Sequence, residues 1–200
     1  MTSSPAVDVT ITSSPDIFDI DGHTDLSIRL NLTLRHDKPI TLHKRYTSLF
    51  DGKILHDGGL TFTDVETGQR VPRSTLNICY FSGESFSWAT RSQYVTLYPG
   101  KQHVIDTGFT PLSTSGREKT DPRAPWVRSL KFAGFKDGQK CRIGITENAS
   151  VRDWFKGTVW EILGWQMLGC TPTTVHTHIS YRVVESSVFT IKRLQDKDDI

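Results

Sequence analysis

Residues 26–35 alternate strictly between aliphatic and polar side chains. Successive side chains of a β-strand point to opposite faces, so this segment predicts a strand with one aliphatic face and one polar face. A helix of the same sequence would spread its leucines around the whole circumference. Burial of the five aliphatic side chains contributes about 7–15 kcal/mol before conformational entropy is counted. We therefore expect this strand at the centre of a sheet.

The alternation continues beyond a short break. Residues 36–39 have the composition of a turn, and Ile40 and Leu42 then resume the apolar pattern. Lys44 falls on the register of these two residues. Its position predicts either a β-bulge or the departure of the strand from the core.

Short runs with strand character recur along most of the chain. They lie at residues 60–62, 76–80, 94–98, 104–109, 130–132, 141–145, 175–184 and 188–193, separated by turn-forming residues. This spacing indicates a β-sandwich or a barrel, and the shortage of helical crossovers favours antiparallel sheets. Residues 159–168 are compatible with a strand or a short helix. The predicted fold class is an all-β, antiparallel sandwich with long loops and at most one short helix.

The pattern also indicates how the chain is divided. Residues 1–15 are rich in Ser, Thr and Pro but contain alternating valines, which predicts a flexible N-terminal arm or an edge strand. We expect residues 16–194 to form a single sandwich domain and residues 195–200 a frayed charged tail. Residues 111–126 are a long polar connection of a kind that is often functional.

Composition narrows the range of partners. A net charge of +2 without a dense basic stripe argues against nucleic acid. No apolar run is long enough to cross a bilayer, and the N-terminus lacks the features of a signal peptide, so we expect no membrane and a cytoplasmic location. The three cysteines, Cys79, Cys141 and Cys170, are too few and too widely spaced for a disulfide framework or a cysteine-based zinc site.

Several short motifs resemble a set of uncharacterised proteins of filamentous fungi. The motifs are Lys-Pro-Ile-Thr at residues 38–41, Gly-Leu-Thr-Phe-Thr-Asp at 59–64, Leu-Tyr-Pro-Gly at 97–100, Gly-Gln-Lys-Cys-Arg at 138–142 and a later Trp-rich segment. The resemblance covers the layout of residues 24–193. It implies an immunoglobulin-like β-sandwich and a fungal origin, and it transfers no catalytic residues.

Candidates for catalysis come from single residues, because the chain contains no Gly-x-Ser-x-Gly motif and no phosphate-binding glycine motif. An enzyme that mainly orients its substrate needs few polar groups. For such an enzyme the candidate catalytic residues are His103, Asp106 and Tyr94, and we expect no cofactor.

Aromatic side chains supply the candidate binding residues Trp88, Trp126 and Trp154. Aromatic residues on loops can line a pocket for a sugar or a hydrophobic small molecule, although most aromatic residues fill protein cores. Trp88 and Trp126 have mainly polar neighbours in the sequence, which favours an exposed position for both.

His176 and His178 lie two residues apart in a predicted strand, so both would point to the same face. Two imidazoles at this spacing can bind a metal only if a third ligand converges on them. Ser180 and Arg182 share this face and indicate that it is solvated. We therefore expect no metal site here.

Three functions remain open. The first is a non-enzymatic module that binds an unknown protein or a small hydrophobic molecule, as sandwich domains commonly do. The second is a small enzyme of secondary metabolism, such as a cyclase or an isomerase, with an aromatic-lined pocket. The third is a protease inhibitor that presents residues 111–126 as a rigid substrate mimic.

Overall fold

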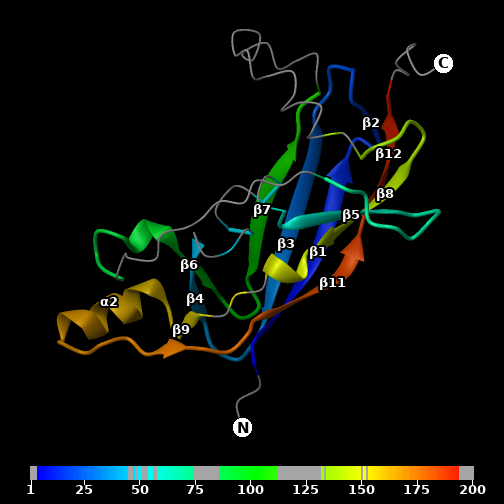
Figure 1. Ribbon diagram of the computed structural model, residues 1–200. Coiled ribbons are helices and arrows are strands. Elements are labelled where there is room, and N and C mark those ends of the chain that lie inside the picture. Colours follow the sequence, from blue (N-terminus) through cyan, green and yellow to red (C-terminus); the bar gives the residue numbers. More distant parts are fainter. Residues whose placement is uncertain are drawn as a thin grey trace.

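The computed structural model describes residues 4–44, 47, 49–50, 54–55, 58–73, 86–111, 132, 134–149, 151 and 153–193. Strands account for most of the regular structure (Figure 1). The strands are β1 (Ala6–Ser14), β2 (Ile17–Asp19), β3 (Leu26–Arg35), β4 (Ile40–His43), β5 (Leu60–Asp64), β6 (Tyr94–Leu97), β7 (Gln102–Phe109), β8 (Lys140–Ile145), β9 (Trp154–Lys156), β10 (Thr174–Val175), β11 (Ser180–Ser186) and β12 (Val188–Lys192). The helical segments are η2 (Arg91–Gln93), η4 (Glu147–Ala149) and α2 (Val159–Met167).

The strands form three four-stranded sheets. The first sheet has the order β11-β1-β3-β7, the second β2-β12-β8-β5 and the third β10-β9-β4-β6. Most neighbouring strands are antiparallel, so the predicted all-β, sandwich-like fold class is confirmed. The prediction of purely antiparallel sheets needs correction, because β1 pairs with β11 and β2 pairs with β12 in parallel.

Strand β3 confirms the alternation from which the fold was predicted. Its five aliphatic side chains are at most 4% exposed, whereas Ser27, Arg29 and Arg35 are exposed. The strand lies between β1 and β7 in the first sheet, with hydrogen-bonded neighbours on both sides. Its buried face is therefore a continuous wall of the core.

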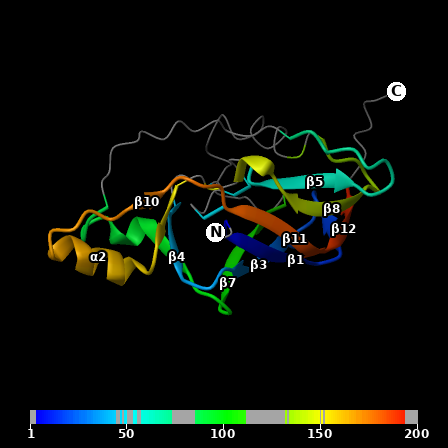
Figure 2. The same cartoon turned by 90° about the horizontal axis from the view of Figure 1, so that it is seen from below.

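Phenylalanine rings fill the space between the first two sheets. Figure 2 shows β5 and β8 of the second sheet lying over β1 and β3 of the first. Ring centroids in this layer are 5.4–6.4 Å apart, which is typical of tilted and edge-to-face aromatic packing. The rings belong to Phe18, Phe62, Phe109, Phe132, Phe135 and Phe189.

The third sheet extends from one end of this sandwich. β4 continues the chain after β3 and pairs with β6 and β9. Figure 2 places β4 and α2 together at this end of the molecule. Lys44 lies in a 3-10 turn directly after β4, which agrees with the predicted departure of the strand from the core.

The N-terminal segment differs from the prediction. Residues 6–14 form neither a flexible arm nor an edge strand, because β1 is an interior strand with β11 on one side and β3 on the other. Val7, Val9 and Ile11 are fully buried. Among the described residues, no helix combines the length and the apolar character needed to cross a bilayer.

Candidate functional site

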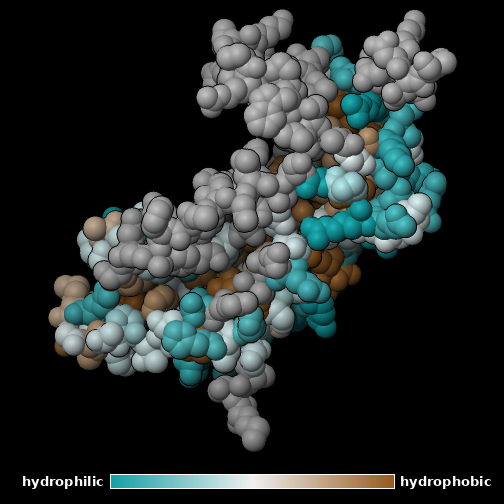
Figure 3. Space-filling view, in the orientation of Figure 1, coloured by the Kyte–Doolittle hydropathy of each residue, from teal (hydrophilic) through white to brown (hydrophobic). Residues whose placement is uncertain are grey.

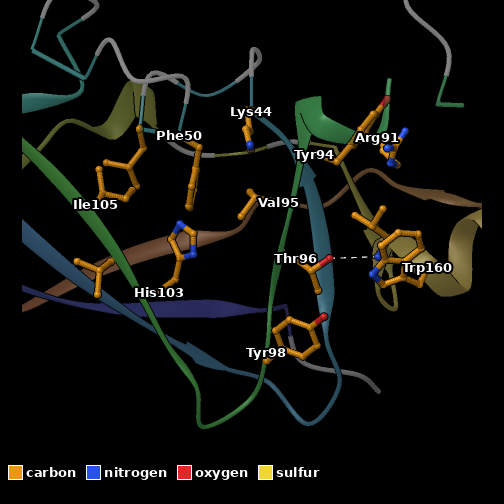
Figure 4. A pocket seen from close by; sticks show the side chains of 13 residues that line it. Lys44, Phe50, Arg91, Tyr94, Val95, Thr96, Tyr98, His103, Ile105 and Trp160 are labelled. Atoms are coloured by element: carbon orange, nitrogen blue, oxygen red, sulfur yellow. Dashed lines mark hydrogen bonds between the residues drawn. The ribbon is translucent and has the colours of Figure 1, made fainter. Parts of the chain in front are cut away.

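The candidate site is an open groove between β6 and β7, called here the β6–β7 groove. The two strands are joined by a turn at residues 98–101 and then diverge, because β6 pairs with β4 in the third sheet while β7 pairs with β3 in the first. Figure 4 shows both strands running from this turn, with Val95 of β6 and His103 of β7 in the space between them and Thr96 on the side of α2. The groove has a volume of about 610 Å³. Small-molecule sites typically measure about 300–1,000 Å³.

The groove has aromatic and aliphatic walls and two basic side chains. Phe50 and Lys44 come from the segment after β4, Arg91 from η2 and Trp160 from α2. The described residues of the lining are Lys44, Leu49, Phe50, Arg91, Tyr94, Val95, Thr96, Tyr98, His103, Val104, Ile105, Val159 and Trp160.

Helix α2 closes one side of the groove and is fixed in place by hydrogen bonds. Its first turn is capped reciprocally: the Glu161 amide donates to Thr158 Oγ1 (3.2 Å) and the Thr158 amide donates to Glu161 Oε2 (2.6 Å). The Val159 amide donates to Thr96 Oγ1 on β6 at 3.1 Å, drawn as the dashed line in Figure 4. These bonds hold Trp160 at the groove, where its side chain remains 61% exposed.

The structure brings two of the three predicted catalytic residues together. His103 projects from β7 into the groove, and its ring centroid lies 5.6 Å from that of Phe50. Burial, and to a lesser degree the charge of Lys44, lowers the pKa of His103 below its usual value. Tyr94 is 7% exposed and forms part of the wall contributed by β6. Both residues therefore border the same cavity, although the Tyr94 ring itself packs against His43 and Phe86, with ring centroids 4.7 Å and 4.4 Å away.

Asp106, the third predicted catalytic residue, does not line the groove. Its carboxylate accepts hydrogen bonds from Arg29 at 2.7 Å and 3.3 Å, on the exposed surface of the first sheet. None of the described residues that line the groove is Asp or Glu. Among these residues, therefore, no carboxylate is placed to orient His103 as in a hydrolase triad.

The three tryptophans predicted to bind a ligand lie in different environments. Trp88 is 55% exposed and packs edge-on against Trp160 at 5.6 Å, beside the groove but outside its lining. Trp154 is only 3% exposed, because the pairing of β9 with β4 directs its side chain into the main core. Its indole Nε1 donates to the Thr177 carbonyl oxygen at 3.0 Å, so its position is structural. Trp126 lies outside the described residues.

The prediction that His176 and His178 lie in one strand is wrong. His176 and His178 are exposed in the segment between β10 and β11. His176 Nδ1 lies 2.7 Å from Asp153 Oδ1, which forms a surface pair. Within the described ranges, no group of three or more His, Cys, Asp or Glu residues is placed to hold a metal.

The sequence did not identify most of the groove. Lys44, Phe50, Arg91 and Trp160 come from segments far apart in the chain, so no local pattern connects them. One local signal was available: Thr158 followed three residues later by Glu161 is a helix-capping pattern, which favours a helix over a strand for residues 159–168.

Two smaller cavities are less suited to a ligand. One, of about 380 Å³, lies along β5 and is lined partly by Arg70 and Arg73. Among the described residues, Arg73 Nε and Nη1 are buried without a hydrogen-bond partner. The other, of about 320 Å³, lies beside α2 and includes the exposed Cys170. Neither brings aromatic walls, several basic groups and a histidine together as the β6–β7 groove does.

Comparisons with known proteins do not assign a family or a function to the chain. No model of a known protein family matches the chain, and no curated protein is significantly similar to it.

Proposed function

We propose that the chain is a non-enzymatic binding module and that the β6–β7 groove holds a small organic molecule with an aromatic or other apolar body. The observation that carries this proposal is a groove of about 610 Å³ whose walls come from two strands anchored in different sheets. Strands with fixed partners form a preorganised site, which lowers the entropic cost of binding. The rings of Phe50, Tyr98 and Trp160 provide flat apolar surfaces for the ligand.

The test uses N-phenyl-1-naphthylamine, a neutral aromatic probe whose fluorescence rises in apolar sites. Saturable binding to the wild type is expected, and Trp160→Ala should weaken it at least about fivefold, because one ring contact contributes about 1 kcal/mol. The matched control is Trp165→Ala. Trp165 lies on the same helix and is equally exposed, at 61%, but it is not part of the groove. No saturable binding, or equal loss in both variants, would refute the proposal.

A second candidate function is favoured by His103. A partly buried imidazole with a lowered pKa is an effective general base at neutral pH, and this one faces the cavity that would hold the substrate. The enzyme alternative, a cyclase or an isomerase, therefore depends on His103 and Tyr94 and no longer involves Asp106. For a ligand that the protein converts, His103→Gln should abolish turnover while leaving the dissociation constant within about threefold.

A protein partner would bind a different surface, at the end of α2. The end of α2 exposes Met167 and Leu168, both 83% exposed, and apolar side chains are visible at this end of the molecule in Figure 3. The protease-inhibitor alternative depends on residues 111–126, of which only Pro111 is among the described residues. We also propose an immunoglobulin-like relationship and a fungal origin, which the resemblance implies, and a cytoplasmic location, which the sequence leads us to expect.

A further inference from the structure

The described lining of the β6–β7 groove carries positive charge. Its charged side chains are Lys44 and Arg91, and none of the described lining residues is Asp or Glu. Neither forms an ion pair with another residue in the described part of the chain. In a groove with low-dielectric aromatic walls, charges of one sign attract a ligand of the opposite sign.

Both basic side chains are held at the groove by single hydrogen bonds. Lys44 Nζ donates to the Ser92 carbonyl oxygen at 2.9 Å, which uses one of its three N–H donors. Arg91 Nη1 donates to the Trp88 carbonyl oxygen at 2.7 Å, and its guanidinium carbon lies 5.0 Å from the Trp88 ring centroid. The guanidinium has five N–H donors, so both residues keep donors for a further acceptor.

The rings and the charges are distributed along the length of the groove (Figure 4). In Figure 4, Lys44 points towards the cavity from the side opposite the turn, and Arg91 lies next to Trp160. The rings of Phe50 and His103 lie next to each other beside β7, and Tyr98 lies near the turn. An elongated ligand in this groove meets apolar surface along its length and positive charge towards the end away from the turn.

His103 couples the charge of the ligand to pH. Its pKa is lowered mainly by burial and further by Lys44, so the imidazole is neutral in the empty groove at pH 7. A negative group near Lys44 favours the protonated imidazole and raises this pKa. By linkage, an anion then binds more tightly as the pH falls through the pKa of His103.

Building on the proposed function, we infer that the ligand of the β6–β7 groove is an amphipathic organic anion, with its apolar body on the aromatic walls and its oxyanion group in the positive field at the end of the groove away from the turn, where Lys44 and Arg91 lie. Charge-assisted hydrogen bonds from an ammonium and a guanidinium are roughly twice as strong as neutral ones. They therefore select an acid over a neutral molecule of the same shape.

The test compares two probes that share the same arylamine body. 1-Anilinonaphthalene-8-sulfonate carries a sulfonate, and N-phenyl-1-naphthylamine does not. The double variant Lys44→Gln/Arg91→Gln should weaken binding of the sulfonate probe at least about tenfold and leave the neutral probe within about twofold. The matched control is Lys140→Gln/Arg142→Gln, which removes the same charges from exposed positions on β8.

Binding of the sulfonate probe to the wild type should also tighten as the pH falls below ~6.5, through the lowered pKa of His103, and His103→Gln should remove this dependence. If both probes bind but the Lys44/Arg91 variant weakens them equally, or weakens the sulfonate probe no more than the β8 control does, the inference is wrong while the proposed function stands. If neither probe binds the wild type, both fail.

Discussion

Arg73 offers a sharp test of how this fold tolerates a buried charge. Its guanidinium carbon lies 5.0 Å from the ring centroids of both Phe62 and Phe109. Nη2 donates to the Leu55 carbonyl oxygen at 3.1 Å, whereas Nε and Nη1 are buried without a partner. Burial, reinforced by the charge of Arg70, lowers the pKa of Arg73 to about 10.

The opposing contributions can be compared. A fall of the pKa from 12.5 to about 10 means that the folded protein disfavours the charged guanidinium by roughly 3 kcal/mol. Two cation–π contacts contribute about 0.5–2 kcal/mol each, and the hydrogen bond to Leu55 about 1 kcal/mol. These terms nearly cancel. Arg73→Met keeps an apolar stem and removes the charge, so it should change the free energy of unfolding at pH 7 by less than about 1 kcal/mol.

The sign of the pH dependence provides a second measurement. The folded pKa of Arg73 lies below the unfolded pKa, so the cost of the charge is present in full below pH 10 and is relieved as the pH rises through that value. Relative to Arg73→Met, the free energy of unfolding of the wild type should rise by roughly 1.4 kcal/mol between neutral pH and pH 11. The assay is urea unfolding of both proteins at several pH values. The titratable groups that the two proteins share contribute equally to both, so their contributions cancel in the difference. The reasoning is refuted if Arg73→Met lowers the free energy of unfolding by more than about 3 kcal/mol at pH 7. It is also refuted if the difference in this free energy between the two proteins does not change with pH.

Two further predictions concern the first sheet. Leu30→Ala should lower the free energy of unfolding by about 2–5 kcal/mol, whereas Ala at the exposed Ser27 should change it by less than about 0.5 kcal/mol; similar urea midpoints would contradict the alternation of β3. The pKa of Asp8 is lowered mainly by its hydrogen bond to Arg35, so its stabilising effect is present above pH ~3.9 and is lost as the pH falls through the lower folded value. The difference in urea midpoint between wild type and Asp8→Asn should therefore shrink below pH 4, and a constant difference would argue against the ion pair.

The strands that the sequence predicted correctly are those with one buried face. In β3, β5 and β8 the burial of successive side chains alternates, so a period of two is visible in the sequence. β1 was misjudged because its neighbours are polar and its partners are distant. Asp8 in this strand is 7% exposed and pairs with Arg35 of β3 and with Arg182 of β11, a residue 174 positions away. No local pattern indicates an interior strand that carries a buried carboxylate.

In the groove, too, contacts between residues close in the sequence could be predicted, whereas those set by distant strand pairing could not. His103 and Tyr94 lie on either side of a predicted turn, and the strands on each side bring both into one cavity. Trp154 and Trp160 could not be separated by sequence, since both belong to the same aromatic segment. The pairing of β9 buries the first, and the capped start of α2 presents the second to the groove.

The construction of the groove also explains why a ligand would stabilise it. β6 and β7 are the outermost strands of their sheets, so within the described residues each has a hydrogen-bonded strand on one side only. Unpaired strand edges are a liability that proteins usually cover with a helix, a charge or a partner. Here α2 covers part of β6 through the bond from Val159 to Thr96, and Lys44 and Arg91 place charge beside the remaining space. A bound anion would neutralise this charge and cover the apolar walls, so the features that leave the empty groove exposed are the same ones that select its ligand.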